Sequence, residues 1–222
     1  MGLSILITQC MQRDFIDPLP PHQPLPNALH VGRGEAQRLL GADPSRGPMA
    51  QLMHWAREQP GEDLSVIHIR DWHDRDDPMQ RHHLEQFGEH CIQNTPGAEL
   101  VLGLDTMVDQ RSSERFIDAT TLNDFVDTNL AEVLQDLTEG YEPEDVRVGV
   151  IGVWTEAKVS FLLYELLTRC HFTQLATCSA LTASASRTQH FNALTQLRKI
   201  LGVQVHDSVG EFASWLMPDG DF

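Results

Sequence analysis

Lys158 is the residue of this 222-residue chain whose position points most directly to chemistry. It follows an apolar run at residues 146–153 that does not alternate with polar residues, which is typical of a parallel strand covered on both faces. Helical spacing of apolar residues begins near Thr155, so this strand is predicted to pass directly into a helix. The free N–H groups and positive dipole end at the start of such a helix favour an anion or a developing negative charge. We therefore expect Lys158, on the first helical turn, to face a pocket.

A second group of candidate residues lies in a polar, histidine-rich loop. Asp71 and His73 come directly after a predicted strand, and His90 lies near the far end of the loop. The Asp-x-His spacing places two side chains on one side of an extended segment, and the third arrives from the other end. Three further histidines are interpreted as ordinary core or surface residues: His68, His82 and His83.

Strands that alternate with helices must position these side chains. Such alternation predicts an α/β fold with a parallel sheet and right-handed crossovers. We find no internal repeat or clear linker, so residues 1–222 are predicted to form one domain. The predicted strands cover residues 3–8, 65–70, 106–109, 146–153, 173–178 and 203–206. The predicted helices cover residues 48–58, 121–137 and 190–201, with one beginning near Thr155 and a closing one around residues 212–216.

Composition narrows the classes of partner. The chain carries 32 acidic and 16 basic residues, a formal net charge of −16, which argues against nucleic acid or an anionic membrane surface as a partner. No apolar run approaches the roughly 20 residues of a membrane helix, and no basic leader precedes the first strand. A cytoplasmic location is therefore expected. The four cysteines lack metal-type or disulfide-type spacing and are expected to be reduced: Cys10, Cys91, Cys170 and Cys178.

Several stretches carry a resemblance to a known family, in the same order along the chain. Residues 11–15 (MQRDF) resemble "D-M-Q-N-D-F", and residues 70–73 (RDWH) resemble "D-W-H". Residues 90–100 (HCIQNTPGAEL) resemble "H-C-V-x-G-T-P-G-A-E-L". Residues 152–159 (GVWTEAKV) resemble "G-x-x-T-x-x-C-V", and residues 180–185 resemble "D-A-x-A-S". Together these motifs resemble those of the isochorismatase-like hydrolase superfamily, which includes nicotinamidases and N-carbamoyl amidases.

The resemblance implies a specific architecture. It predicts a single-domain, Rossmann-like three-layer sandwich with a six-stranded parallel sheet in the order 3-2-1-4-5-6 and helices on both faces. The pocket would lie above strands one and four, where the strand order reverses, as open α/β sheets prefer. The family also implies a homodimer or homotetramer.

The resemblance further implies a catalytic Cys, Asp and Lys, and all three identities differ here. By position, the nucleophile falls on Lys158, the Asp base on Cys10 and, by a weaker match, the Lys on Gln110. Asp14 matches a second acidic residue that is interpreted as a structural cap of the loop. With these substitutions the usual thiol–carboxylate mechanism cannot run in its usual form.

The same resemblance implies how a ligand would be held. A cis peptide bond is expected between Val153 and Trp154, with the N–H groups of Trp154 and Lys158 forming an oxyanion or ligand site. Trp154 would narrow the pocket, which favours a flat or small ligand, and an anion would fit beside Lys158. Asp71, His73 and His90 match the metal ligands of nicotinamidases, and three such N and O ligands with open positions would suit Zn²⁺, Mn²⁺ or Fe²⁺. In other members these positions brace the loop by hydrogen bonds. This interpretation requires no cofactor, but a divalent cation (Zn²⁺, Mn²⁺ or Fe²⁺) could bind as an optional one.

Three hypotheses about function follow. The leading one is a protein with a degenerate triad that binds a small carbonyl, carboxylate or amide metabolite. The second is a rewired hydrolase of a small amide or ester, with Cys10 as nucleophile and Lys158 lowering its pKa. The third is a regulatory or oligomerisation module in which the proline-rich loop at residues 17–26 contacts a partner.

Overall fold

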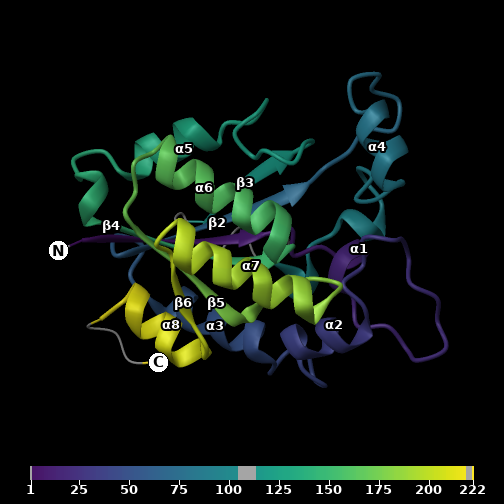
Figure 1. The fold of residues 1–222 in the computed structure, drawn as a ribbon, viewed down its shortest axis with the longest axis horizontal. Helices are drawn as coiled ribbons and strands as arrows, with labels where there is room; N and C mark the ends of the chain where they lie inside the picture. Colours follow the sequence, from purple (N-terminus) through teal and green to yellow (C-terminus); the bar gives the residue numbers. More distant parts are fainter. Residues whose placement is uncertain (1, 105–113, 219–221) are drawn as a thin grey trace.

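A six-stranded parallel sheet in the order β3-β2-β1-β4-β5-β6 forms the centre of the protein (Figure 1), as the sequence predicted. The computed structural model describes residues 2–104, 114–218 and 222. The strand predicted at residues 106–109 falls outside the described residues, and the third strand of the sheet is β3, Glu114–Ala119. The other strands are β1 (Leu3–Gln9), β2 (Leu64–Asp71), β4 (Val146–Val153), β5 (Gln174–Ala183) and β6 (Gln204–His206).

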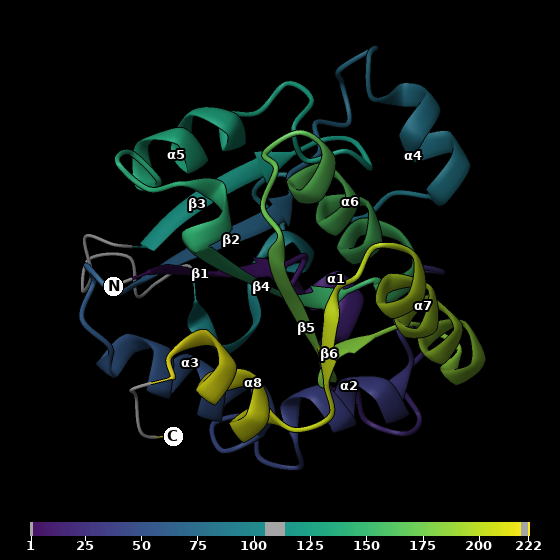
Figure 2. The same cartoon turned by 60° about the vertical axis from the view of Figure 1, so that its left-hand side comes forward.

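Helices cover both faces of the sheet (Figure 2) because its strands are apolar on both sides. In β1, Ile5 and Ile7 join one hydrophobic cluster and Leu6 joins the other. The first cluster lies under α5, α6 and α7, and the second lies under α2, α3 and α8. These helices are α2 (Arg33–Leu40), α3 (Pro48–Glu58), α5 (Leu130–Leu137), α6 (Ser160–Thr168), α7 (Arg187–Ile200) and α8 (Val209–Leu216).

The prediction of a helix at residues 121–137 is wrong for the first half of that segment. Helix α5 begins only at Leu130, and residues 120–129 form an irregular segment after β3. Polar side chains compete for its backbone N–H groups: Asn123 accepts from Phe125 at 3.0 Å, and Thr128 accepts from Leu130 at 3.2 Å. Asp127 adopts a left-handed conformation with φ 56°, which a helix cannot contain. The apolar periodicity therefore reflects burial of a loop rather than a helix.

Several short helices were not predicted from the sequence. They include α1 (Arg13–Ile16) and α4 (Arg81–Phe87), which interrupt segments interpreted as continuous loops, and α2 was missed as well. The turn after β4 is a π-type turn, η5 (Thr155–Val159), that leads into α6 as expected. Short 3-10 turns complete the chain at η1 (Pro96–Ala98), η2 (Val101–Gly103) and η4 (Pro143–Asp145).

The carboxyl ends of β1 and β4 meet where the strand order reverses, and the two chains approach closely there. Gly152 has φ 115°, and a Cβ at this position would collide with the carbonyl of Gln9. Only glycine allows this approach. The end of β1 thereby lies against the end of β4, next to the turn that carries Lys158.

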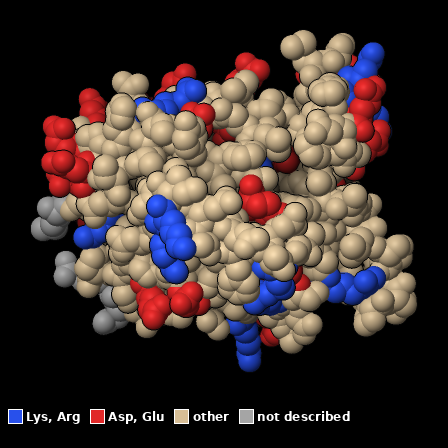
Figure 3. Space-filling model, in the orientation of Figure 1, with Lys and Arg blue, Asp and Glu red and all other residues tan. Residues whose placement is uncertain are grey.

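Acidic side chains are prominent on the surface (Figure 3), in keeping with the formal net charge of −16. On the face drawn in Figure 3, Lys and Arg side chains are scattered among uncharged residues, and acidic side chains gather along the upper left edge. Within the described part of the chain, none of the helices is both long and apolar enough to cross a membrane.

Candidate functional site

The candidate residues gather at the carboxyl ends of three neighbouring strands. Cys10 follows β1, Asp71 closes β2, and Trp154 follows β4. Lys158 lies in the turn η5 directly after Trp154. Because β2, β1 and β4 are adjacent in the sheet, these residues meet at one edge. Cys10 and Lys158 therefore line the same cavity, as the family resemblance predicted.

The Lys158 ammonium is held by three acceptors at its tip. Nζ lies 2.7 Å from Asp124 Oδ1 and 2.9 Å from Asp71 Oδ1, and it donates to the carbonyl of Thr121 at 2.8 Å. Lys158 is only 5% exposed. An ammonium has three N–H groups, so these three partners use all of them.

Asp124 is a site residue that the sequence analysis missed. It lies in the irregular segment after β3, where a helix was predicted, and on a helix it would have been one more polar residue of the outer face. In the structure its carboxyl group is fully buried, and Gln9 Nε2 donates to Oδ1 at 3.4 Å. A single acidic residue among Leu122, Phe125 and Val126 was the only signal available.

The two carboxyl groups beside Lys158 differ in their electrostatics. Burial alone would raise the pKa of Asp71, but Lys158, followed by His73, holds it below the usual value. Burial dominates at Asp124 and raises its pKa despite the contact with Lys158. Burial would lower the pKa of Lys158, yet Asp124 and Asp71 raise it well above the usual value. Lys158 is therefore an ammonium, and Asp71 is its charged partner.

Cys10 is a neutral thiol in this arrangement. Its side chain is buried, Sγ donates to Asp71 Oδ1 at 3.5 Å, and Gln9 Nε2 donates to Sγ at 3.2 Å. Burial and the neighbouring Asp71 carboxylate raise the pKa of Cys10 well above its usual value, and the opposing effect of Lys158 is smaller. The expectation that Lys158 lowers the pKa of Cys10 overall is thus wrong, because Lys158 is already paired with carboxylates.

A cavity of about 150 Å³ lies beside these groups. Its polar lining consists of Cys10, Asp71, Lys158 and two histidines, His83 and His90. The remaining wall is apolar, with three aromatic residues among its seven: Phe15, Leu29, Phe87, Leu122, Val153, Trp154 and Ala157.

Three histidines meet at one end of the cavity. His73, His83 and His90 place their ligand nitrogens within 4.8 Å of one another. The ring centroids of His73 and His83 lie 4.8 Å apart in a stacked arrangement, and those of His73 and His90 lie 4.6 Å apart. His83, interpreted from the sequence as an ordinary histidine, belongs to this cluster. The spacing of seven residues between His83 and His90, across the unpredicted helix α4, concealed this proximity.

The donor atoms of this cluster fit a divalent cation. His73 Nδ1 lies 3.0 Å from Gln80 Oε1, and His90 Nδ1 lies 2.7 Å from the carbonyl of Gly88, which leaves both Nε2 atoms available. Among the described residues, buried His73 Nε2 has no hydrogen-bond partner. Asp71 Oδ2 lies 3.9 Å from His73 Nε2 and 3.8 Å from His90 Nε2. Burial lowers the pKa of His73 and takes that of His83 to about 4, which favours the neutral ligand form.

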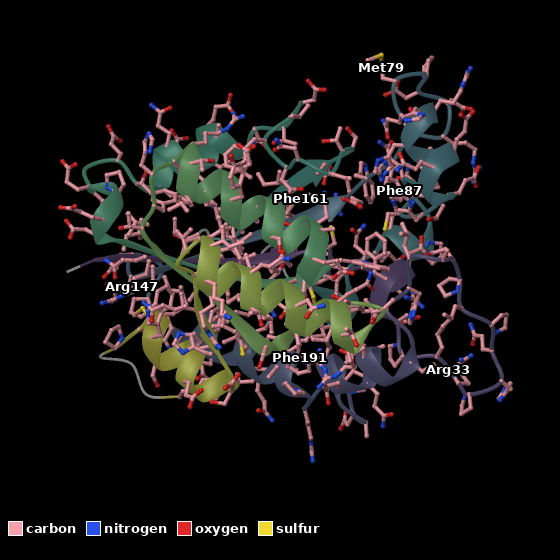
Figure 4. All side chains as sticks on the ribbon, in the orientation of Figure 1. Arg33, Met79, Phe87, Arg147, Phe161 and Phe191 are labelled. Carbon is pink, nitrogen blue, oxygen red and sulfur yellow. The ribbon has the colours of Figure 1, made fainter. Side chains whose placement is uncertain are left out.

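Helix α4 covers the histidine end of the cavity. It stands out from the body at the upper right of Figure 1, and none of its residues is buried. Phe87 ends α4 near the body, whereas Met79, in the turn that precedes α4, lies at the far tip of this projection (Figure 4). The His83 and Phe87 rings lie 4.8 Å apart, and both line the cavity. The cover thus contributes one potential metal ligand and one aromatic wall.

Two structural expectations are met, and one site residue cannot be placed. The Val153–Trp154 peptide bond is cis. Asp14 caps the loop as expected, since its Oδ2 accepts the Cys91 N–H at 2.7 Å. Gln110, the expected third triad position, lies outside the described residues.

Comparisons with known proteins agree with this architecture. The model of the isochorismatase domain family matches residues 4–207. No curated protein matches the sequence.

Similar folds occur among solved structures. A pyrazinamidase/nicotinamidase from Streptococcus mutans UA159 aligns with a TM-score of 0.71 and 21% identity, covering 91% of this chain and 99% of that one. An isochorismatase-like hydrolase from Alkaliphilus metalliredigens aligns with a TM-score of 0.71 and 21% identity, covering 96% and 98%. A pyrazinamidase of Pyrococcus horikoshii in complex with zinc aligns with a TM-score of 0.64 and 23% identity, covering 92% and 98%.

Proposed function

Because the chain belongs to the isochorismatase family, we propose that it binds a small planar metabolite with a carbonyl, carboxylate or amide group and does not use a cysteine thiolate on it. The observation that supports this proposal is the buried, protonated thiol of Cys10. The thiolate, not the thiol, is the nucleophile in cysteine chemistry. Burial and Asp71 keep Cys10 protonated, and the nearby Lys158 is committed to Asp71, Asp124 and Thr121.

The dimensions of the cavity support a ligand the size of one ring. A dry cavity of 150 Å³ lined by apolar side chains is known to hold benzene, and this cavity has about the same volume. The side chains of Phe15, Phe87 and Trp154 supply aromatic surfaces against which a planar ligand can pack. A few polar groups beside an apolar wall are the usual composition of a small-molecule site.

The histidine cluster supports a divalent cation as part of this site. We infer that His73, His83 and His90, with Asp71, would hold it, and zinc is the first candidate because a structural neighbour was solved with zinc. Such an ion would act as a Lewis acid on a carbonyl or heteroatom of the ligand. This chain's own residues position the donors: Gln80 and Gly88 orient two of the rings, and α4 supplies the third.

Ligand binding without turnover is the first expected result. Since similar structures are named as nicotinamidases and pyrazinamidases, nicotinamide and pyrazinamide are the first probes. Calorimetric titration is expected to give a Kd below about 1 mM for at least one of them, with no release of ammonia between pH 6 and 9. Cys10→Ser is expected to retain binding within about tenfold.

The opposite result is equally clear. Ammonia release by the wild type that disappears in Cys10→Ser would favour the rewired hydrolase, with Cys10 as nucleophile. Absence of binding by both probes, in the presence and absence of zinc, would count against nicotinamidase-type ligands.

Zinc binding provides an independent test of the histidine cluster. Competition with a chromogenic chelator is expected to show one tight zinc site, weakened at least about tenfold in His83→Ala, since loss of a ligand or of its supporting groups has effects of this size or larger. His82→Ala is the matched control, because His82 is the exposed neighbour of His83 on the same helix and is outside the cluster. Equal zinc affinity of the wild type and His83→Ala would remove His83 from the site.

A further inference from the structure

We propose that the outer face of α6 binds a second copy of this chain, related to the first by a two-fold axis that runs along α6. This helix has the sequence SFLLYELLT, with Glu165 as its single charged residue. Three of its leucines are buried in the core, whereas Phe161 and Tyr164 point outward and are 43% and 52% exposed. A helix that is apolar all round is normally buried on every side. The exposed face of α6 is therefore expected to be covered by a partner.

A groove of about 280 Å³ lies beside these exposed rings. It is lined by Leu122, Asn123, Phe161, Tyr164 and Glu165. Because one patch offers both exposed aromatic rings and a groove lined by them, it can pack against a copy of itself, as a two-fold interface requires. Leu122 is 38% exposed and also lines the candidate cavity. A second copy seated on this groove would therefore lie at the edge of the candidate site.

Helix α6 alone is too small to form a stable interface. Its nine residues span about 14 Å, and a helix with its side chains is about 10 Å wide. A stable interface buries about 800 Å² on each partner, several times the area that this length and width enclose. The neighbouring helices must therefore take part, and α6 lies between α5 and α7 on one face of the sheet (Figure 1 and Figure 2).

The two neighbouring helices carry opposite charges. Residues 130–145, which comprise α5, the loop after it and η4, contain six acidic residues and no basic residue: Glu132, Asp136, Glu139, Glu142, Glu144 and Asp145. Helix α7 contains three basic residues and no acidic residue: Arg187, Arg198 and Lys199. In Figure 3, acidic side chains gather on the left beside α5, and basic side chains lie over the left end of α7. This face thus has an acidic side, an apolar middle and a basic side.

The charge pattern determines how a second copy would be oriented. A two-fold axis along α6 places α5 of each copy opposite α7 of the other, so that acidic and basic side chains meet on both sides of the apolar middle. A two-fold axis across α6 would instead place α5 opposite α5, where acidic side chains repel one another. Complementary charge of this kind fixes the register of an interface. The face is complementary to itself, which favours a second copy over an unrelated protein. The family resemblance implied a homodimer or homotetramer but indicated no surface.

Sedimentation equilibrium tests the surface. At about 0.15 M salt, where screening limits the repulsion between two acidic chains, we expect twice the 25.0 kDa mass of one chain. Tyr164→Lys places a charge on the outer face of α6 and is expected to raise the dissociation constant of the dimer at least about tenfold. Met79→Lys is the matched control, because Met79 is 88% exposed and lies at the far tip of the projection that carries α4 (Figure 4). A wild type that stays monomeric up to about 100 μM, or equal dissociation constants for the wild type and Tyr164→Lys, would overturn the proposal.

Charge reversal tests the direction of the axis and uses exposed residues that the fold does not bury. Glu132→Lys combined with Asp136→Lys makes α5 basic, so an axis along α6 predicts a dissociation constant raised at least about fivefold. Adding Arg198→Glu and Lys199→Glu makes α7 acidic, and the fourfold variant should recover most of the lost affinity. General repulsion predicts the opposite for the first variant, because each replacement adds two charges and brings the net charge from −16 to −12. Unchanged or tighter association of that variant would exclude this axis and overturn the proposal.

Discussion

Replacing Lys158 with methionine is expected to lower the free energy of unfolding by about 3–5 kcal/mol at pH 7. The substitution preserves the length of the side chain and removes the only lysine or arginine paired with Asp71 and Asp124 within the described residues. It therefore leaves two acidic side chains buried without a counter-charge. This loss far exceeds that of an exposed ion pair, which is about 0–1 kcal/mol.

Urea unfolding at several pH values measures this effect. Lys199→Met is the matched control, since Lys199 is the other lysine of the chain and is exposed on α7; it is expected to change stability by less than about 0.5 kcal/mol. The loss in Lys158→Met should shrink as the pH falls toward 4, because without the ammonium both carboxyl groups take up protons more readily.

A second variant keeps the test informative if Lys158→Met does not fold. Adding Asp71→Asn and Asp124→Asn removes the uncompensated charges, so the triple variant should recover most of the lost stability. A triple variant that is no more stable than Lys158→Met would show that packing, rather than charge, is the role of Lys158.

The arrangement of strands was predictable because it depends on patterns that the sequence displays. The runs at residues 3–8 and 146–153 are mostly apolar without a regular polar alternation, and each coincides with a strand at the centre of the sheet. The segment at residues 120–129 has equally regular apolar spacing but is not a helix. There, side-chain hydrogen bonds from Asn123 and Thr128 decide the local conformation, and the spacing of apolar residues does not reveal them.

The site was predictable only in part for a related reason. Position along the chain identified Cys10 and Lys158 as neighbours, because strand order determines which strand ends meet. It did not reveal that Asp124 would reach Lys158 from an irregular loop, or that α4 would carry His83 to His73. Both contacts depend on tertiary packing of segments without a sequence signature. As a result, the charge balance of the pocket became apparent only in three dimensions.

Acid sensitivity of the sheet edge is the second large effect that the structure predicts, and it arises at Glu114. This residue begins β3, and its side chain is 1% exposed. Oε1 lies 2.9 Å from Arg57 Nε on α3, and Oε2 lies 3.6 Å from His68 Nε2 on β2. His68 Nδ1 in turn lies 2.7 Å from Thr8 Oγ1 on β1. The carboxylate thus links three strands of the sheet to a covering helix.

The pKa of Glu114 determines the pH range over which these contacts stabilise the fold. Burial alone would raise it, but His68 and Arg57 bring the pKa down to about 2, compared with an ordinary value of 4.5. Because the folded-state pKa is the lower one, the stabilisation is fully present above pH 4.5 and is lost as the pH falls toward 2. The difference corresponds to about 3 kcal/mol.

Glu114→Gln is accordingly expected to lose about 2–3 kcal/mol at pH 7 and to show a flatter decline of stability between pH 4.5 and pH 3 than the wild type. Urea midpoints measured at pH 7, 5, 4 and 3 provide the comparison. Glu58→Gln is the matched control, because Glu58 is exposed on α3, next in sequence to Arg57. Parallel pH curves for the wild type and Glu114→Gln would show that the carboxylate is not ionised against Arg57 and His68. The acid sensitivity of the fold would then have to arise at other carboxyl groups, among them Asp71, whose pKa Lys158 also holds below its usual value.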